Sequence, residues 1–543
     1  MREFGNTSAK CLGRVVVLVM AAMAGSALAR TFTRPLERVS SVDPIRSAAS
    51  NDSLIVHLLY ETILRIDYFA RPYKIVAGVC DLTEVSHDGL EYVLTVREGT
   101  AFHPHEVFGG KGRPVTADDV VYTLRRLKDP QNASGGMWTM ACLKKAEALD
   151  ARRVKITLTK PQHVFPWLLA MPFTGVVARE AVEKYGVRFG GVSVGSGPYR
   201  LVEWQRNHLM RLERVPAWHG WKTIKTEPFD RMEFPVVDDP STKWLMFLAR
   251  EADFMRGIAT DNWDAIVGPD GKLLPELSAK GICLYSAPML EVTFIGCNMK
   301  DPVLGKNRKL RQALNCAFNF EIWNKFCNGR LLPSTGPLPP GVEGRLETPF
   351  AYSYNPEKAK RLLKEAGYPD GIDPATGRRL VLPIAVGNAT QQMREQIELI
   401  AEFYDRVGLR LEPRYMTWNA FLQAVDEGRT SLFHLSWGAD YPDAENFLQL
   451  FHSSNVSPGA NHSCYINPEY DRAYDAAMAA TTEEERNRYW RECQEIVRED
   501  CPWIYTHVPK SNSLVRPSVG NYIPSDFPYG QEAYLEVRGK SDE

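Results

Sequence analysis

The stretch Ser436-Trp437-Gly438-Ala439-Asp440-Tyr441-Pro442-Asp443-Ala444-Glu445-Asn446-Phe447 is the part of the chain from which we interpret the fold. It follows Ser431 to Leu435, a short apolar run that predicts a buried strand. Tyr441-Pro442-Asp443 then turns the chain into a helix that we expect to begin near Glu445. Asp440 would therefore lie at a strand end, where a rigid scaffold often holds functional side chains. Because Asp and Pro are also ordinary turn residues, this stretch taken alone favours a simple turn.

The length and composition of the chain indicate a globular protein of more than one lobe. A chain of 543 residues is too long for one hydrophobic core. Hydrophobic residues make up 44% and charged residues 24%, which is ordinary for a globular protein. The 65 Lys and Arg against 66 Asp and Glu leave a formal net charge of -1. This balance and the lack of a basic run in the sequence suggest no nucleic-acid partner.

Residues 1–29 have the pattern of a secretory signal peptide. Basic residues precede the apolar run from Val15 to Ala24, and Ala27-Leu28-Ala29 has small residues at both positions that a signal peptidase inspects. We therefore expect cleavage after Ala29 and a periplasmic location. A retained membrane anchor is the alternative, although the run is short for a bilayer span. No later segment has the ~18 uninterrupted apolar residues of a membrane helix, so the mature chain is expected to be soluble.

Cysteine pairing is left open by the sequence. Loss of Cys11 with the signal would leave nine of the ten cysteines, and an odd number cannot pair completely within one chain. Cys283 and Cys297 flank two expected strands and are the first candidate disulfide. Buried free thiols are the favoured alternative in a chain of this size.

Expected strands and helices alternate along the chain, which favours an α/β fold. Thr116 to Asp119 would cap a helix with Val120, Leu124 and Leu127 on one face, and Asn355 would cap another. Asp52 or Ser53 would cap the helix that runs to Leu64.

Three further patterns make local predictions. Lys309 to Lys325 predicts one helix. Met232 to Val237 predicts a strand, and Pro235, which lacks an amide hydrogen, would place it at a sheet edge. Gly195-Ser196-Gly197 predicts a tight turn in which glycine allows unusual dihedral angles. That turn lacks the Gly-Lys-Ser/Thr ending of a phosphate-binding loop.

Motifs for catalysis or metal binding are missing. His103, His105 and Glu106, in an expected loop from Phe102 to Arg113, form the only cluster that hints at a metal. They lack the HExxH spacing and a third ligand, so a solvated loop is favoured. The chain has no GxSxG and no assignable Ser, His and Asp set. We therefore expect no catalytic residue, no metal site and no cofactor.

Six motifs occur in an order that resembles family 5 of the bacterial extracellular solute-binding proteins, the peptide and nickel class that serves ABC importers. In chain order they are Ser41-Val42-Asp43-Pro44 with Leu59-Tyr60-Glu61; Gly89 to Gly99 with Thr116-Ala117-Asp118-Asp119-Val120; Gly195-Ser196-Gly197-Pro198-Tyr199; Asn298-Met299 with Arg311-Gln312-Ala313-Leu314; Tyr354-Asn355-Pro356-Glu357-Lys358-Ala359; and Trp437 to Phe447. Each motif is weak alone, but together they cover nearly all of the mature chain.

The resemblance implies an α/β clamp of two lobes that closes over a ligand in the cleft between them. It implies a core of the first lobe from residues 30–60, 190–288 and 500–543, with an extra subdomain at 61–189. The second lobe would comprise residues 289–499.

The resemblance also implies a peptide site. Asp440 would pair with the α-ammonium group of a peptide, and Trp437, Gly438 and Ala439 would pair with its extended backbone. Trp418 would form the wall of a side-chain pocket, with an ordinary core or surface ring as the alternative.

Two further parts of the site follow from the same comparison. The first lobe would contribute Ala48, Ala49 and Ser50. His434 occupies the place where a relative of the oligopeptide type has an arginine that can meet a peptide carboxylate. An anchor at this position would therefore be weak or absent at neutral pH.

The implied function is that of a periplasmic monomer that captures peptides, delivers them to a membrane-embedded ABC permease and performs no chemistry. One alternative is the same fold binding a nickel complex or an oligosaccharide. A secreted hydrolase is the more distant alternative.

Overall fold

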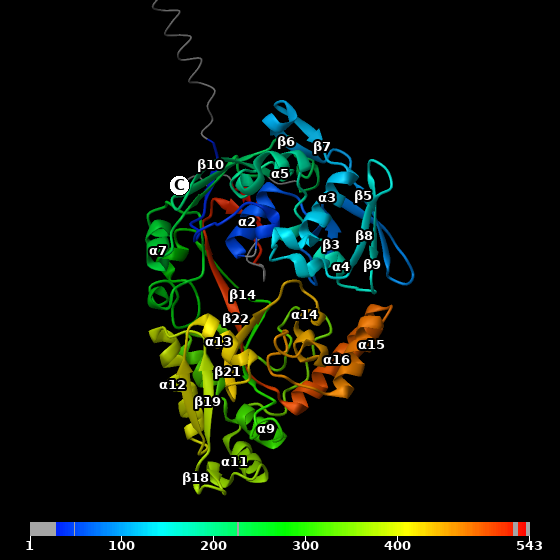
Figure 1. The fold of residues 1–543 in the computed structure, drawn as a ribbon. Helices are drawn as coiled ribbons and strands as arrows, with labels where there is room; N and C mark the ends of the chain where they lie inside the picture. Colours follow the sequence, from blue (N-terminus) through cyan, green and yellow to red (C-terminus); the bar gives the residue numbers. More distant parts are fainter. Residues whose placement is uncertain (1–28, 48, 225–226, 525–529, 539–543) are drawn as a thin grey trace, which may run out of the picture.

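The computed structural model describes residues 29–47, 49–224, 227–524 and 530–538. The expected signal peptide lies outside these residues except for Ala29. The chain folds into two α/β lobes, an upper and a lower one in Figure 1, with β14 and β22 running between them. This arrangement is the predicted two-lobed α/β fold, while the residue boundaries of the lobes stay a prediction.

Two four-stranded sheets build the upper lobe. The first has the order β1 (Thr31–Thr33), β12 (Arg231–Pro235), β11 (Leu209–Arg214) and β10 (Tyr199–Gln205). The second has the order β4 (Cys80–Val85), β5 (Glu91–Val96), β9 (Arg153–Leu158) and β8 (Leu143–Ala148). The alternating burial of β5 and β9 agrees with the alternation of apolar and polar residues in their sequences.

An eight-stranded sheet extends from the upper lobe into the lower lobe. Its main path is β13 (Phe254–Arg256), β22 (Trp503–Val515), β15 (Glu291–Cys297), β21 (Leu432–Gly438), β19 (Val381–Val386) and β20 (Arg410–Tyr415), with β14 (Cys283–Pro288) and β16 (Leu331–Pro333) also paired to β22. Trp503 to His507 of β22 pair with β15, whereas Ser513 to Val515 pair with β13. One continuous strand therefore carries hydrogen bonding from one lobe to the other.

Shorter strand pairs and the helices surround these sheets. The pairs are β2 (Leu64–Asp67) with β3 (Lys74–Ala77), β6 (Ala101–His105) with β7 (Lys111–Pro114), β17 (Ile372–Asp373) with β18 (Arg378–Arg379), and β23 (Val519–Gly520) with β24 (Glu536–Val537). The helices of the upper lobe are α2 (Ser50–Leu59), α3 (Ala117–Lys128), α4 (Phe165–Leu168), α5 (Arg179–Tyr185), α6 (Trp221–Ile224), α7 (Pro240–Leu248) and α8 (Pro275–Ser278). Those of the lower lobe are α9 (Arg308–Ala317), α10 (Phe320–Phe326), α11 (Pro356–Glu365), α12 (Gln391–Asp405), α13 (Trp418–Asp426), α14 (Ala444–Leu448), α15 (Pro468–Ala479) and α16 (Glu483–Asp500).

The capping predictions are confirmed for two helices and wrong for a third. Thr116 and Asp119 form a capping box at the start of α3. The Asn355 side chain accepts the Lys358 amide hydrogen at the start of α11. At α2, by contrast, Ala49 is the N-cap residue, and the Asp52 carboxylate accepts hydrogen bonds from Ser40 instead.

The predicted single helix from Lys309 to Lys325 is wrong because the chain breaks it at Phe318. Phe318 has an extended backbone at ψ 116, and α10 starts again after Asn319. The Asn319 side chain accepts the Ile322 amide hydrogen at 3.1 Å. A side chain that caps a new helix competes with continuation of the old one.

The predicted edge position of the Met232 to Val237 strand is also wrong. β12 lies inside its sheet, between β1 and β11. β1 pairs only as far as Glu233, so Pro235 lies beyond the end of that ladder. Just beyond β1 the Leu36 amide donates to the Pro235 carbonyl oxygen at 2.9 Å, so the segment stays paired there and Pro235 lacks only its own donor.

The Gly195 and Gly197 turn depends on close packing instead of unusual dihedral angles. Neither glycine has a positive φ. A Cβ atom on Gly195 would lie 1.8 Å from the Leu59 carbonyl oxygen, and one on Gly197 would lie 2.6 Å from that of Leu58. The turn therefore needs glycine because α2 passes against its backbone.

The candidate disulfide between Cys283 and Cys297 is wrong. All nine described cysteines are free thiols, and Cys283 alone among them is exposed. Cys283 pairs with Val515 at one end of β22, whereas the Cys297 amide bonds Pro502 just before its other end. The two sulfurs therefore lie at opposite ends of the long strand.

Candidate functional site

The end of β21 leaves one side of its backbone unpaired. β21 pairs with β15 along its whole length, from Cys297 opposite Leu432 to Glu291 opposite Gly438. On its other side β19 pairs only as far as His434. Leu435 to Gly438 therefore present an open sheet edge, to which an extended ligand can add as a strand.

A cavity of ≈ 720 Å³ adjoins this open edge. Its lining residues are Val386, Gly387, Asn388, Ala389, Met393, Met416, Thr417, Trp418, His434, Leu435 and Ser436. The Trp418 side chain is 53% exposed and stacks on Phe421 with ring centroids 5.3 Å apart. Trp418 is thus a wall of the cavity and not a core residue.

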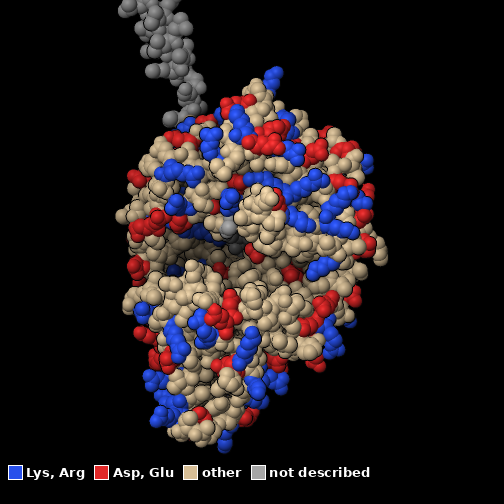
Figure 2. Space-filling view, viewed as in Figure 1, with Lys and Arg blue, Asp and Glu red and all other residues tan. Residues whose placement is uncertain are grey.

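A second cavity of ≈ 450 Å³ lies between the lobes, where the molecular surface is hollowed in Figure 2. Its lining includes Arg256 and Asn512 from the upper lobe side and Glu291 and His507 from the lower lobe. Met393, His434 and Ser436 line both cavities. The two cavities are therefore parts of one cleft along β21.

Asn446 holds the turn that carries Asp440. The Asn446 side chain is fully buried, and its Oδ1 accepts the Trp437 indole Nε1–H at 3.1 Å and the Asp440 amide hydrogen at 3.2 Å. Asp443 caps the following helix by accepting the Glu445 amide hydrogen at 2.9 Å. The helix starts at Ala444, one residue before the predicted position. The hydrogen bonds of Asn446 and Asp443 together fix the turn that carries Asp440.

Two carboxylates, those of Asp440 and Glu291, lie at the end of β21. Burial raises the pKa of Asp440, and the Asn446 side chain partly opposes this shift. Burial likewise raises the pKa of Glu291, and a hydrogen bond with the Ser436 hydroxyl partly opposes this shift. Neither carboxylate forms an ion pair within the described part of the chain. A cationic group entering here would meet poorly hydrated negative charge, which strengthens the attraction.

Glu291 is a site residue that the sequence did not predict. It reaches the site through its cross-strand position opposite Gly438. The Ser436 and Thr293 hydroxyls next to it lie 2.7 Å apart. The sequence carries no signal for this pairing because the two strands are distant in the chain.

The histidines of the cleft supply no positive charge at neutral pH. Burial lowers the pKa of His434 to about 4 and that of His507 to about 3, with His434 also lowering the latter. Their imidazoles are therefore neutral. The cations of the second cavity are Arg256, Arg330 and Lys510, which the sequence analysis did not single out.

Of the three residues expected from the upper lobe, Ala48 lies outside the described residues. Ala49 and Ser50 are exposed at the start of α2. Neither lines the two cavities along β21.

The expected loop around His103 is the β6–β7 hairpin. His103 is buried, and its Nε2–H donates to the Gly197 carbonyl oxygen at 2.8 Å. Burial lowers the pKa of this imidazole to about 4. Within the described ranges, no group of three or more His, Cys, Asp and Glu side chains could hold a metal ion. Among the same residues, no helix has the length and apolar character needed to span a membrane.

Two bacterial binding proteins are similar to this chain in sequence. The chain is 28% identical over 476 residues to heme-binding protein A of Haemophilus influenzae, covering 84% of this chain and 83% of that protein. It is 27% identical over 476 residues to the glutathione-binding protein GsiB of Salmonella typhi, covering 87% of each.

Solved structures share the fold. HbpA2 from Haemophilus parasuis matches with a TM-score of 0.81 and 22% identity, covering 94% of this chain and 100% of that one. The unliganded open form of the periplasmic murein tripeptide binding protein MppA matches with a TM-score of 0.77 and 21% identity, covering 94% and 98%. The family described as bacterial extracellular solute-binding proteins, family 5 Middle, matches residues 74–459. This match spans more than half of the sequence, and the chain therefore belongs to family 5 of the bacterial extracellular solute-binding proteins.

Proposed function

We propose that this solute-binding protein captures short peptides by their α-ammonium group and delivers them to the permease of an ABC importer. The observation that carries the proposal is the half-buried Asp440 carboxylate beside the open edge of β21, without a counter-cation among the described residues. A bound ammonium group would neutralise this charge and form charge-assisted hydrogen bonds. The relatives named for glutathione and for murein tripeptide support a solute of peptide character.

The peptide backbone would lie along the open edge. Leu435 to Gly438 have one side free, so an extended peptide would pair there as an added strand next to Trp437 and Gly438. The first side chains of the peptide would then enter the cavity walled by Trp418. Glu291 would add a second negative charge near the ammonium end.

The carboxylate end of the peptide would be met from the second cavity. His434 is neutral there, so it offers hydrogen bonds but no charge. Lys510 lines this cavity and bonds only weakly to the Gly329 carbonyl oxygen, at 3.5 Å. Its ammonium group is the cation of this cavity that we assign to the ligand carboxylate.

Delivery requires a ligand that contacts both lobes. The second cavity takes residues from each lobe, so a peptide that fills it would stabilise the closed arrangement. Asp440 and the open edge of β21, the other parts of the proposed site, belong to the lower lobe. Binding would therefore begin on the lower lobe and end with closure.

The experiment is native mass spectrometry of protein purified without refolding, followed by calorimetry with the identified solute. A co-purified peptide with a free amino terminus is the expected result. A co-purified oligosaccharide or metal complex, or hydrolysis of added peptides, would overturn the proposal.

Haem is the second candidate, because heme-binding protein A is among the similar proteins and neutral imidazoles face the cleft. A neutral histidine nitrogen can ligate haem iron. Titration with hemin, followed by its absorbance band, tests this candidate. A band shift lost in His434→Gln would favour haem, and an unchanged spectrum would exclude it.

A further inference from the structure

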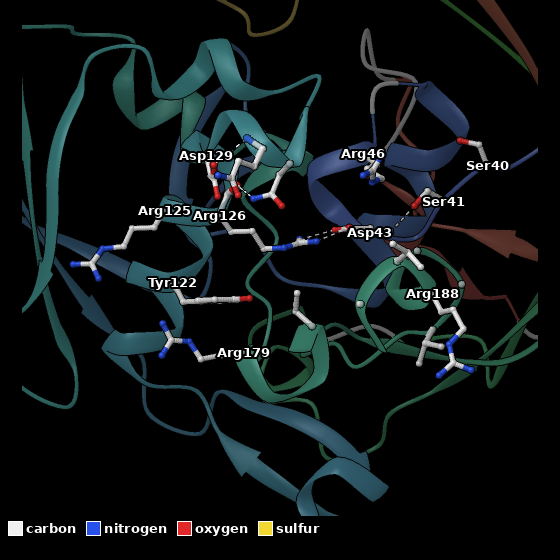
Figure 3. A pocket seen from close by; sticks show the side chains of 18 of the residues that line it. Ser40, Ser41, Asp43, Arg46, Tyr122, Arg125, Arg126, Asp129, Arg179 and Arg188 are labelled. Carbon is white, nitrogen blue, oxygen red and sulfur yellow. Dashed lines mark hydrogen bonds and ion pairs between the residues drawn. The ribbon is translucent and has the colours of Figure 1, made fainter. Parts of the chain in front are cut away.

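A cavity of ≈ 1220 Å³ on the upper lobe is lined by arginine side chains. It lies where α3 and α5 face the short helix at Pro44–Arg46 and the segment Gly186–Gly191 (Figure 3). Its charged lining residues are Asp43, Arg46, Arg125, Arg126, Asp129, Arg179, Arg188 and Arg206. We call this site the arginine pocket. It shares no residue with the two cavities along β21.

One arginine of the pocket is neutralised by the protein itself. Arg126 donates to both carboxylate oxygens of Asp43, at 2.8 and 2.7 Å, and Figure 3 shows the two side chains meeting inside the pocket. Both side chains are nearly buried. This bidentate ion pair joins two sides of the pocket. Because both oxygens of Asp43 bind Arg126, the Asp43 carboxylate does not compensate the charges of the other arginines.

The charges of the remaining five arginines are largely uncompensated by carboxylates of the protein. Arg125 donates to the Ala146 carbonyl oxygen, and Arg206 donates to that of Ser40. Among the described residues neither guanidinium group forms an ion pair with a carboxylate. Arg46 and Arg188 form no ion pair or hydrogen bond within the described part of the chain. Asp129 is the only further carboxylate in the lining.

Arg179 has a weak partner. It lies 3.7 Å from Glu183 in a pair whose side chains are 61% and 67% exposed. Exposed pairs of this kind contribute little and are screened by salt. Its guanidinium also lies over the Tyr122 ring, 4.9 Å from the centroid, and Figure 3 shows both side chains at the same side of the pocket.

We propose that the arginine pocket binds a polyphosphate oxyanion, a group with at least two linked phosphates. The whole chain has a net charge of -1, so this excess of positive charge in one cavity is local. The lining cations are all arginine, whose planar fork matches phosphate oxygens in pairs. The cavity volume exceeds the need of one phosphate, and several phosphate charges would balance the uncompensated guanidinium groups.

Calorimetric titration with tripolyphosphate at low salt tests the site. The variant Arg179→Gln/Arg188→Gln removes two exposed guanidinium groups from different sides of the pocket. Arg378→Gln/Arg410→Gln removes the same charge from exposed strand positions of the lower lobe and is the matched control. Both variants are to be checked for a native circular dichroism spectrum.

We expect saturable binding to the wild-type protein and to the control variant. The pocket variant should raise Kd by about tenfold or more, because hydrogen bonds to charged groups are among the stronger ones. Equal weakening in both variants, or no saturable binding to the wild type, would overturn the proposal. Peptide binding in the cleft should be the same in all three proteins, so this result does not depend on the proposed transport function.

Vesicle sedimentation separates the two sources of the phosphate groups. If they belong to a soluble compound, tripolyphosphate binds the pocket and vesicles containing a polyprenyl diphosphate do not retain the protein. If they belong to lipid headgroups, the vesicles retain the wild-type protein, and tripolyphosphate releases it. Retention that the pocket variant does not reduce would contradict a role for the arginine pocket on membranes.

Discussion

The His163 imidazole Nε2 lies 3.4 Å from Asp443 Oδ1 and joins the upper lobe to the lower lobe. His163 precedes α4 of the upper lobe, and Asp443 caps α14 of the lower lobe (Figure 1). His163 also lies against Trp490, with ring centroids 6.3 Å apart. Because Asp443 belongs to the same turn as Asp440, this contact couples the proposed ammonium site to the position of the opposite lobe.

Asp443→Asn should lower the free energy of unfolding by about 1 kcal/mol, because it keeps a capping residue but removes the charge that meets His163. Burial alone would raise the pKa of Asp443, but the His163 and Glu445 contacts outweigh it and lower the pKa. The stabilisation is therefore present above the unfolded pKa of about 3.9 and is lost as pH falls through the folded pKa.

Urea denaturation from pH 7 downward tests this prediction. The stability difference between the wild type and Asp443→Asn should stay constant down to about pH 5 and shrink below about pH 4. A difference of the same size at all pH values would contradict the ionic contribution of Asp443.

His434→Gln should make stability less sensitive to acid. Burial lowers the folded pKa of His434 to about 4, whereas the unfolded value is about 6.5. The unfolded chain therefore takes up this proton first, so stability is full above about pH 6.5 and falls as the pH drops toward the folded pKa. Comparing unfolding at pH 7 and pH 5 checks the sign. An equal loss of unfolding free energy between pH 7 and pH 5 in the wild type and in His434→Gln would refute the prediction.

Trp418→Ala should weaken binding of a peptide with an aromatic side chain by about tenfold, through lost ring contacts. Stability should change by about 0.5 kcal/mol or less, because the side chain is 53% exposed. Trp138 is 44% exposed on the upper lobe, so Trp138→Ala is the control for removing an exposed indole. Calorimetry that shows equal affinity for both variants would remove Trp418 from the site.

Gly195→Ala should lower the free energy of unfolding by about 1–3 kcal/mol, because the new methyl group would overlap the Leu59 carbonyl oxygen. Gly191→Ala is the control, since Gly191 is exposed and the nearest neighbour of its new methyl group is the end of the Arg206 side chain, at 3.3 Å. Thermal unfolding gives the comparison. Equal unfolding midpoints for the two variants would show that the turn can move away from α2.

The features that the sequence predicted well are local ones. The capping box at Thr116 and the Asn355 cap involve residues a few positions apart, so their patterns are readable in one segment. The strand that ends beside Asp440 and the turn after it also follow from neighbouring residues. The family resemblance rested on several such local patterns in order.

The features that the sequence did not predict depend on distant pairing. Glu291 reaches the end of β21 only through strand pairing, and Lys510 reaches the cleft only because β22 crosses between the lobes. Pro235 lies inside a sheet because the segment that follows β1 pairs with it through the Leu36 amide, far earlier in the chain. The arginine pocket likewise collects residues from separate segments, which is why no basic run marks it in the sequence.

Calorimetry with one peptide in free-amino and N-acetylated forms, on the wild type and Asp440→Asn, tests the assignment of Asp440 most directly. The substitution keeps the shape of the side chain and removes its charge. We predict that it raises Kd for the free-amino peptide by about a hundredfold, because one partner of a buried charge pair is lost, and barely changes Kd for the acetylated form. Equal losses for the two forms would contradict the role of Asp440 as the ammonium partner.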